Sequence, residues 1–196
     1  MVATLHRLEM TDLAVLSERA ALGPDAQAAL RGCPDVASAL SRLEAAGFTA
    51  EALRLLAHAL PAREGVWWAC MCASSTAPRD LGADDRLARE TAELWARQPS
   101  DELRHLAMSH AEAGGCTTAE AWAAIAAFWS GESIGRAGHP VVTPVPGQGN
   151  GAVGAAVTLA GVRGDGKRHG ARLKRMLDSG REIASGGTGR LPAESV

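Results

Sequence analysis

Apolar residues recur every three or four positions along most of this chain, which is the spacing of an amphipathic α-helix. Between Pro34 and Gly47, for example, the apolar positions fall on one face of a helix that Pro34-Asp35 opens and Gly47 ends. Similar start and stop residues punctuate the rest of the pattern. The sequence therefore predicts helical segments over about 12–21, 24–31, 35–46, 49–60, 61–73, 83–97, 100–114, 117–130, 151–162 and 168–184.

Three polar residues are expected to cap these helices. Thr49 is predicted to cap the helix that follows it, and Asn150 the helix near 151. Thr117, with Glu120 three positions later, has the spacing of a capping box. Trp122 and Trp129 in that helix share the apolar face, so we expect it to be an amphipathic core helix.

The helix predicted at 61–73 holds eight consecutive apolar residues, from Val66 to Ala73, including Trp67 and Trp68. Neighbouring side chains on a helix point about 100° apart. Both tryptophans are therefore shielded only if other helices surround this one on most sides. We expect it to be the central, wholly buried helix of the fold.

The chain changes character after Gly131. Residues 131–151 are rich in glycine and proline and are predicted to form a tether over the surface. This divides the chain into a helical body at 1–130, the tether at 131–151, a basic C-terminal helical pair at 152–185 packed on the body, and a flexible tail at 186–196. The predicted fold is all-α, with seven to nine helices packed as an irregular bundle or a short superhelix around the 61–73 helix.

Composition supports helices and excludes few functions. The apolar residues are mostly alanine and leucine, with five tryptophans, two phenylalanines and no tyrosine, and this mixture disfavours strands. The four cysteines have no framework spacing, so we interpret them as reduced. Neither a signal peptide nor an apolar run long enough for a bilayer is present, so a cytoplasmic protein without membrane contact is expected.

Charge is segregated along the chain. Residues 1–135 carry a net charge of −7, whereas residues 136–196 carry +5. The positive excess lies in a cluster that we take as the candidate partner-binding face. Its members are Arg163, Lys167, Arg168, Arg172, Lys174 and Arg175.

Three interpretations of this basic cluster are open. It could contact nucleic acid, but it lacks interleaved aromatic residues and the protein is slightly acidic overall, so this is the least favoured. It could capture an acidic surface of another protein. It could instead dock the C-terminal segment onto the acidic body of its own chain.

A metal site is the main alternative among the candidate chemistries. Glu102 and His105 have an E-x-x-H spacing, which places a carboxylate and an imidazole on one helix face as in di-iron bundles. No second E-x-x-H exists, although Glu64, Glu90 and Glu93 could donate further carboxylates. The GxGxxG at Gly149–Gly154 follows a proline-rich tether, not a strand, so it does not predict a nucleotide site. No cofactor is expected.

A longer combination of residues resembles a known family. Ala59-Leu60-Pro61-x-Arg63-Glu64-x-Val66-Trp67-Trp68-Ala69-Cys70 is followed by Ala92-x-x-Trp95-x-x-x-Pro99 and Ala123-Ala124-x-Ala126-x-x-Trp129. Together they resemble an uncharacterised family of small helical bacterial proteins, over roughly residues 35–185. The resemblance implies a loose association with type VI secretion gene neighbourhoods and carries over no catalytic residues.

These observations lead to one favoured function and two alternatives. The favoured function is a non-enzymatic adaptor or accessory subunit that binds another bacterial protein through the basic face, within a secretion-related assembly. The first alternative is a metal-binding bundle or enzyme that uses Glu64, Glu90, Glu102 and His105. The second is a homo-oligomer with Trp122 and Trp129 in the contact face.

Overall fold

The computed structural model describes residues 5–135 and 139–194. These ranges contain ten α-helices, one short 3-10 segment and no strand, so the all-α prediction is confirmed. The helices are α1 (Leu13–Arg19), α2 (Pro24–Ala29), α3 (Val36–Ala45), α4 (Thr49–Ala59), α5 (Ala62–Ser75), α6 (Ala83–Arg97), α7 (Asp101–Ala113), α8 (Ala119–Trp129), α9 (Gln148–Gly161) and α10 (His169–Ala184), with the 3-10 segment η1 (Gly166–Arg168) before α10.

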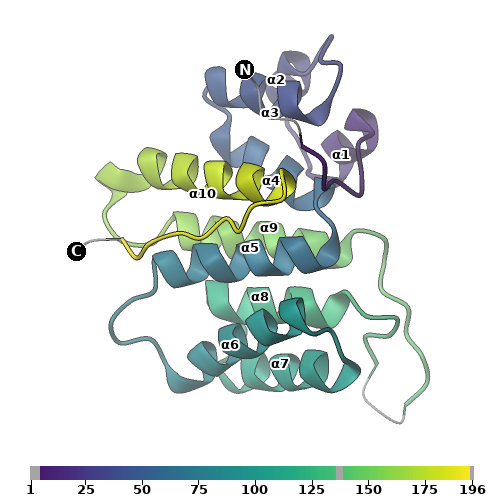
Figure 1. Cartoon of the computed structure of the whole chain (residues 1–196), viewed down its shortest axis with the longest axis vertical. Helices are drawn as coiled ribbons and strands as arrows, with labels where there is room; N and C mark the ends of the chain where they lie inside the picture. Colours follow the sequence, from purple (N-terminus) through teal and green to yellow (C-terminus); the bar gives the residue numbers. More distant parts are fainter. Residues whose placement is uncertain (1–4, 136–138, 195–196) are drawn as a thin grey trace.

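Helices α5 and α9 lie side by side through the middle of the molecule (Figure 1). On one side of them are α4 and α10, with α1–α3 beyond, and on the other side are α8, α6 and α7. Helix α5 packs against α6, α8, α9 and α10, so it is central as predicted. Helix α9 packs against α4, α5 and α8, which embeds it in the core, whereas α10 covers α4 and α5 from outside.

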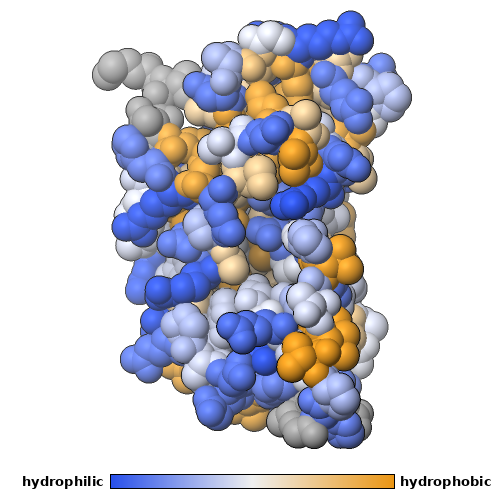
Figure 2. All heavy atoms as spheres, turned by 90° about the vertical axis from the view of Figure 1, so that its right-hand side faces the viewer, coloured by the Kyte–Doolittle hydropathy of each residue, from blue (hydrophilic) through white to orange (hydrophobic). Residues whose placement is uncertain are grey.

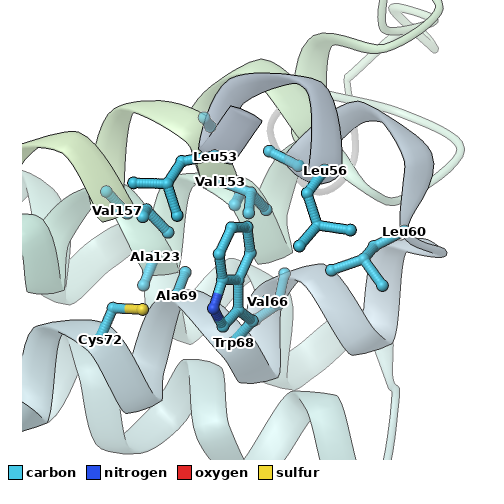
Figure 3. Packing of buried hydrophobic residues seen from close by; sticks show 14 of the residues in the cluster. Leu53, Leu56, Leu60, Val66, Trp68, Ala69, Cys72, Ala123, Val153 and Val157 are labelled. Carbon is cyan, nitrogen blue, oxygen red and sulfur yellow. The ribbon is translucent and has the colours of Figure 1, made fainter. Parts of the chain in front are cut away.

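The predicted burial of both tryptophans on α5 is wrong for one of them. Trp68 is fully buried among aliphatic side chains that include Leu56 and Val153 (Figure 3). Its indole N–H donates to the Met176 carbonyl of α10 at 2.9 Å. Trp67 is only half-buried: its Nε1 donates to the Thr188 carbonyl in the chain segment after α10, and Arg97 of α6 lies over its ring.

Gly180 allows the close approach of α10 to Trp68. A Cβ added at Gly180 would lie 2.6 Å from the Leu56 Cδ2 atom and 2.8 Å from the Trp68 Cε2 atom. Real Cβ atoms do not approach other atoms so closely, so only glycine fits while the indole reaches the carbonyl one turn earlier.

Helix α8 is buried around most of its circumference, because it packs against α5, α6, α7 and α9. Its alanines let these helices approach closely. The predicted apolar face does pack against the core, but Trp122 and Trp129 on it are only partly buried and lie edge to face, with ring centroids 6.2 Å apart. Their role in an oligomer contact stays a prediction.

The three predicted caps are wrong in detail. Thr118 caps α8 by accepting from the Ala121 N–H, while Glu120 is fully buried and serves another purpose described below. Helix α4 starts with Thr49 inside the helix and has no side-chain cap. Asn150 lies inside α9 and donates to the carbonyls of Ala57 and Leu60 at the end of α4.

The predicted tether is shorter than 131–151, since α9 already starts at Gln148. Buried Arg104 fixes its beginning by donating to the Ser133 carbonyl at 2.6 Å and to the Phe128 carbonyl at 3.4 Å. Val141 and Val145 in the tether are 74% and 70% exposed. The face of the molecule on this side shows separate apolar patches among mostly polar side chains (Figure 2).

The segment after α10 has defined contacts, whereas the sequence led us to expect a flexible tail. It runs back along α10 and α5 toward the far end of α5 (Figure 1). The N-terminal segment also joins the helices, because the Arg7 N–H donates to the Ala184 carbonyl and the Glu9 N–H to the Ala59 carbonyl. Both terminal segments therefore contact the helical body.

Candidate functional site

The six basic residues of the predicted partner-binding face lie at the end of α9, in η1 and on α10. They do not form one free surface. Arg163 and Arg172 are largely occupied inside the molecule, while Lys167 and Arg168 are exposed in η1. Lys174 and Arg175 lie on α10 with partners of their own.

Arg163 joins the C-terminal region to the core. Its guanidinium pairs with both carboxylate oxygens of Glu120, and the contact from Nη1 to Oε1 measures 2.8 Å. The Glu120 side chain is fully buried, whereas that of Arg163 is 19% exposed. This pair explains the absence of a capping box at Glu120. It also means that Arg163 is not available to a partner, contrary to the sequence-based prediction.

Arg172 has the most complete set of contacts in the cluster, and its side chain is only 3% exposed. Nε donates to Glu194 Oε2 at 2.7 Å, and Nη2 donates to Glu194 Oε1 at 3.1 Å. Nη1 donates to the Gly161 carbonyl at 3.0 Å, at the end of α9. The guanidinium is therefore held in place by the protein backbone and presents one edge to a carboxylate.

The carboxylate of Glu194 belongs to the chain segment after α10. Hydrogen bonds from Arg172 hold the pKa of the Glu194 carboxyl below its usual value. Beside the pair is a hollow of about 280 Å³, with Arg163, Arg168 and Asp165 in its lining. The Ser75 and Thr76 end of α5 forms the opposite wall. Guanidinium groups in a partly enclosed site suit a carboxylate or a phosphate.

The rest of this segment is also held by the body. We call residues 186–194 the C-terminal strap. Trp67 Nε1 donates to the Thr188 carbonyl at 2.7 Å, and Ser179 Oγ donates to the Gly189 carbonyl at 2.5 Å. Arg175 Nη2 donates to the Pro192 carbonyl at 2.9 Å.

The strap closes with a main-chain bond, from the Glu194 N–H to the Ser75 carbonyl at 2.7 Å. Three of the body's side chains thus contact main-chain carbonyls of the strap, and a fourth, Arg172, binds the carboxylate of Glu194. Sequence reasoning missed Trp67, Ser179 and Glu194 as one group. The available signal was an acid at the end of a tail that follows a basic helix.

Lys174 supports the interpretation in which the basic cluster docks onto the chain's own acidic body. Its Nζ lies 3.4 Å from Glu44 Oε1 of α3 and 2.9 Å from Asp178 Oδ2. Arg181 pairs with the other Glu44 oxygen at 2.7 Å. Within the basic cluster, Lys167 and Arg168 of η1 are exposed, and so is the Lys174 side chain, at 60%.

The residues of the metal alternative do not form a site. Among the described residues, no three His, Cys, Asp or Glu side chains come together as a ligand set, so Glu64, Glu90, Glu102 and His105 are not assembled. His105 instead packs edge to face on Phe128, at 5.2 Å between ring centroids. No di-iron chemistry follows from this arrangement.

The cysteines and glycines also have structural roles. Cys70 and Cys72 are free thiols buried in α5, and burial raises the pKa of both. The glycines of the GxGxxG lie within α9, where Gly149 packs near Ser130 and Gly154 near Ala57. They serve close helix packing and do not form a phosphate loop.

Comparison with known proteins gives one match. The model of a family described as "Family of unknown function (DUF6931)" matches residues 39–184. No curated protein and no solved structure matches the chain. The family region includes α4–α10, and with them Trp67, Arg172 and Ser179, but neither the strap nor the first 38 residues. Across the described ranges, no helix is both long enough and apolar enough to cross a bilayer.

Proposed function

The chain belongs to the DUF6931 family, whose function is unknown, and from that premise we propose that it is a protein-binding adaptor that receives an extended, acidic segment of another protein. The observation that carries this proposal is the position of Glu194, whose carboxylate lies on the buried Arg172 where the strap contacts α5 and α10. In this proposal the strap occupies in cis the surface that a partner occupies in trans.

The contacts of the strap are of the kind that recognise extended peptides. Donors from Trp67, Arg175 and Ser179 to main-chain carbonyls do not depend on the sequence of the bound segment. Arg172 adds the selective contact, because a guanidinium with two parallel hydrogen bonds prefers a carboxylate. The proposed ligand is therefore an extended segment with one acidic residue. The site places few other requirements on the sequence of that segment.

The burial of Arg172 favours replacement of the strap by an acidic partner segment over release of the strap alone. If the strap left, the guanidinium would lose the Glu194 carboxylate and keep only its contacts to the Gly161 and Asp165 carbonyls, which leaves its charge without a counter-ion. An acidic group of the partner restores the pair. Because the strap is tethered to α10, it competes at a high effective concentration, so weakening the strap raises the apparent affinity for a partner.

Arg168 lines the hollow beside this site and exposed Lys167 precedes it in η1, so both add positive charge that attracts an acidic partner. The resemblance to proteins encoded near type VI secretion genes makes components of that machinery the first partners to assay. Neither catalysis nor a cofactor is part of the proposal.

The test uses full-length protein and a labelled peptide of residues 186–196, with binding measured by fluorescence anisotropy. Glu194→Gln in the protein weakens the strap, so the variant should bind the peptide about tenfold or more tightly than the unchanged protein. A peptide with glutamine in place of its glutamate should not show this gain in affinity. Glu112→Gln, an exposed acid on α7, is the matched control and should behave like the unchanged protein.

Equal peptide affinity for the Glu194→Gln variant and the unchanged protein would overturn the proposal. Equal affinity for the two peptides would also overturn it, since Arg172 would then not recognise a carboxylate. If the peptide results agree with expectation, Glu194→Gln protein expressed at the native locus becomes the bait for partner capture. A variant with Arg168, Arg172 and Arg175 changed to Glu should then lose the partner.

A further inference from the structure

A second hollow, of about 460 Å³, lies at the other end of the strap. The N-terminal segment, the start of α5, the end of α6 and the strap meet there. Four arginines line it: Arg7, Arg63, Arg97 and Arg190. Glu64 is the one acidic lining residue, so the lining carries a formal excess of three positive charges.

Two of the four guanidinium groups are held in fixed positions. Arg63 Nε donates to the Ala96 carbonyl at 3.0 Å, and its Nη2 donates to the Arg97 carbonyl at 3.2 Å. The Arg97 guanidinium pairs with Glu93 at 2.5 Å and lies over the Trp67 ring, 5.2 Å from the centroid. These contacts fix the positions of two guanidinium groups on one wall of the hollow before a ligand binds.

The other two arginines have no such partners. Within residues 5–135 and 139–194, neither the Arg7 nor the Arg190 guanidinium makes a hydrogen bond or an ion pair. Like charges gathered in one hollow repel each other, and the repulsion falls when an anion enters. Each free guanidinium offers several N–H donors in a planar fork, which fits a tetrahedral oxyanion.

We propose that this arginine hollow binds a small molecule that carries phosphoryl groups. Its volume is in the range of ligand pockets, so it has room for more than a single phosphate. Trp67, which also lines the hollow, offers an aromatic surface beside the charges. The hollow is separate from the carboxylate site at Arg172, and the inference does not depend on the proposed function.

Arg7 and Arg190 both lie outside the region that matches the family, in the first 38 residues and in the strap. A bound phosphoryl group would thus join the two ends of the chain to Arg63 and Arg97 of the body. Thr188 of the strap lines the same hollow. Binding should therefore hold the strap more firmly against the body.

The experiment measures binding to the full chain by isothermal titration calorimetry at about 0.15 M salt, with inorganic pyrophosphate and ADP as probes. We expect saturable binding with one site per chain and a Kd below about 1 mM. The double variant Arg7→Gln, Arg190→Gln should weaken it about tenfold or more. The matched control is Arg31→Gln, Arg79→Gln, which removes the same charge from two exposed positions outside the hollow and should bind as the unchanged protein does.

The probes separate the two sources of the phosphoryl group. Equal affinity for pyrophosphate and ADP means that the phosphates alone are recognised. Tighter binding of ADP, with quenching of tryptophan fluorescence that a Trp67→Leu variant abolishes, means that an organic part is recognised too. Each of these results supports the site.

Three outcomes would overturn it. The first is the absence of saturable binding of either probe up to about 10 mM. The second is an equal loss of affinity in the control double variant, which would indicate only the general charge of the protein. The third is binding of a polyanion such as duplex DNA, with no response to the small probes. Thermal unfolding of both double variants verifies that a loss of binding is not a loss of folding.

Discussion

The buried pair of Glu120 and Arg163 provides the sharpest test of how this fold is held together. Arg163→Met removes the only cation that contacts the Glu120 carboxylate in the described part of the chain, while Glu120 itself is 0% exposed. Removing one partner of a buried ion pair costs about 3–5 kcal/mol, because the other charge is left without compensation. That is a large part of the roughly 5–15 kcal/mol that holds a domain folded.

The two partners should not be equivalent. Arg163 is 19% exposed and can reach water when Glu120 is replaced, whereas Glu120 has no access to solvent when Arg163 is replaced. We therefore expect Glu120→Gln to cost about 1–3 kcal/mol, less than Arg163→Met. The double variant Glu120→Leu, Arg163→Met should regain most of the loss, since an apolar pair leaves no buried charge.

Equilibrium unfolding in urea, followed by tryptophan fluorescence, measures these differences. For a chain of this size, the loss in Arg163→Met corresponds to a decrease in Tm of about 6–20 °C. Lys167→Met, an exposed neighbour in η1, is the control and should stay within about 0.5 kcal/mol of the unchanged protein. A loss below about 1 kcal/mol in Arg163→Met, or no recovery in the double variant, would refute the reasoning.

Three other expectations follow from the packing and the buried groups. Gly180→Ala should destabilise the protein by about 1–3 kcal/mol in the same unfolding assay, despite the better helix propensity of alanine, because the added Cβ would overlap Leu56 and Trp68. A Cβ at Gly170 on the same helix meets no atom within 4 Å, so Gly170→Ala should be neutral or stabilising. Equal effects of the two substitutions would contradict the overlap. Burial, and to a smaller extent the charge of a neighbouring guanidinium, lowers the pKa of His58 in the folded protein, so the unfolded chain binds a proton more readily. The stability that neutral His58 contributes is therefore lost as the pH falls through about 6.5. The stability difference between the unchanged protein and His58→Gln should accordingly shrink between pH 7.5 and pH 5.5, and a constant difference would show that His58 is not involved. Cys70 and Cys72 should resist a thiol reagent in the folded protein and react after unfolding, because burial shields them and raises their pKa; rapid labelling of either under native conditions, detected by mass spectrometry, would contradict their burial.

Much of the fold could be predicted from short stretches of sequence. The apolar period and the proline and glycine punctuation located the helices to within a few residues, from α3 at Val36–Ala45 to α10 at His169–Ala184. The caps were less predictable. Thr118 and not Thr117 caps α8, and Glu120 pairs with Arg163 from α9's end, because a partner 43 residues away competes with local hydrogen bonding.

The candidate site was predictable only in part. The cluster of basic residues was visible in the sequence, but the charges of Arg163, Arg172 and Lys174 are directed to Glu120, Glu194 and Glu44. The carboxylate site beside Arg172 needs the end of α9, the start of α10 and the strap together. No local pattern specifies that combination, since its members are brought together by helix packing.

The sequence by itself determined the secondary structure of this protein, because helix period, helix ends and the absence of strand-forming composition are properties of neighbouring residues. Tertiary structure decided which of two adjacent tryptophans is buried, which arginines face solvent, and that the segment after α10 lies against α5 and α10. Those outcomes depend on which side chains, distant in sequence, fill the same space, as Gly180 and Trp68 do. The arginine hollow has the same origin, since its four guanidinium groups come from four separate segments of the chain.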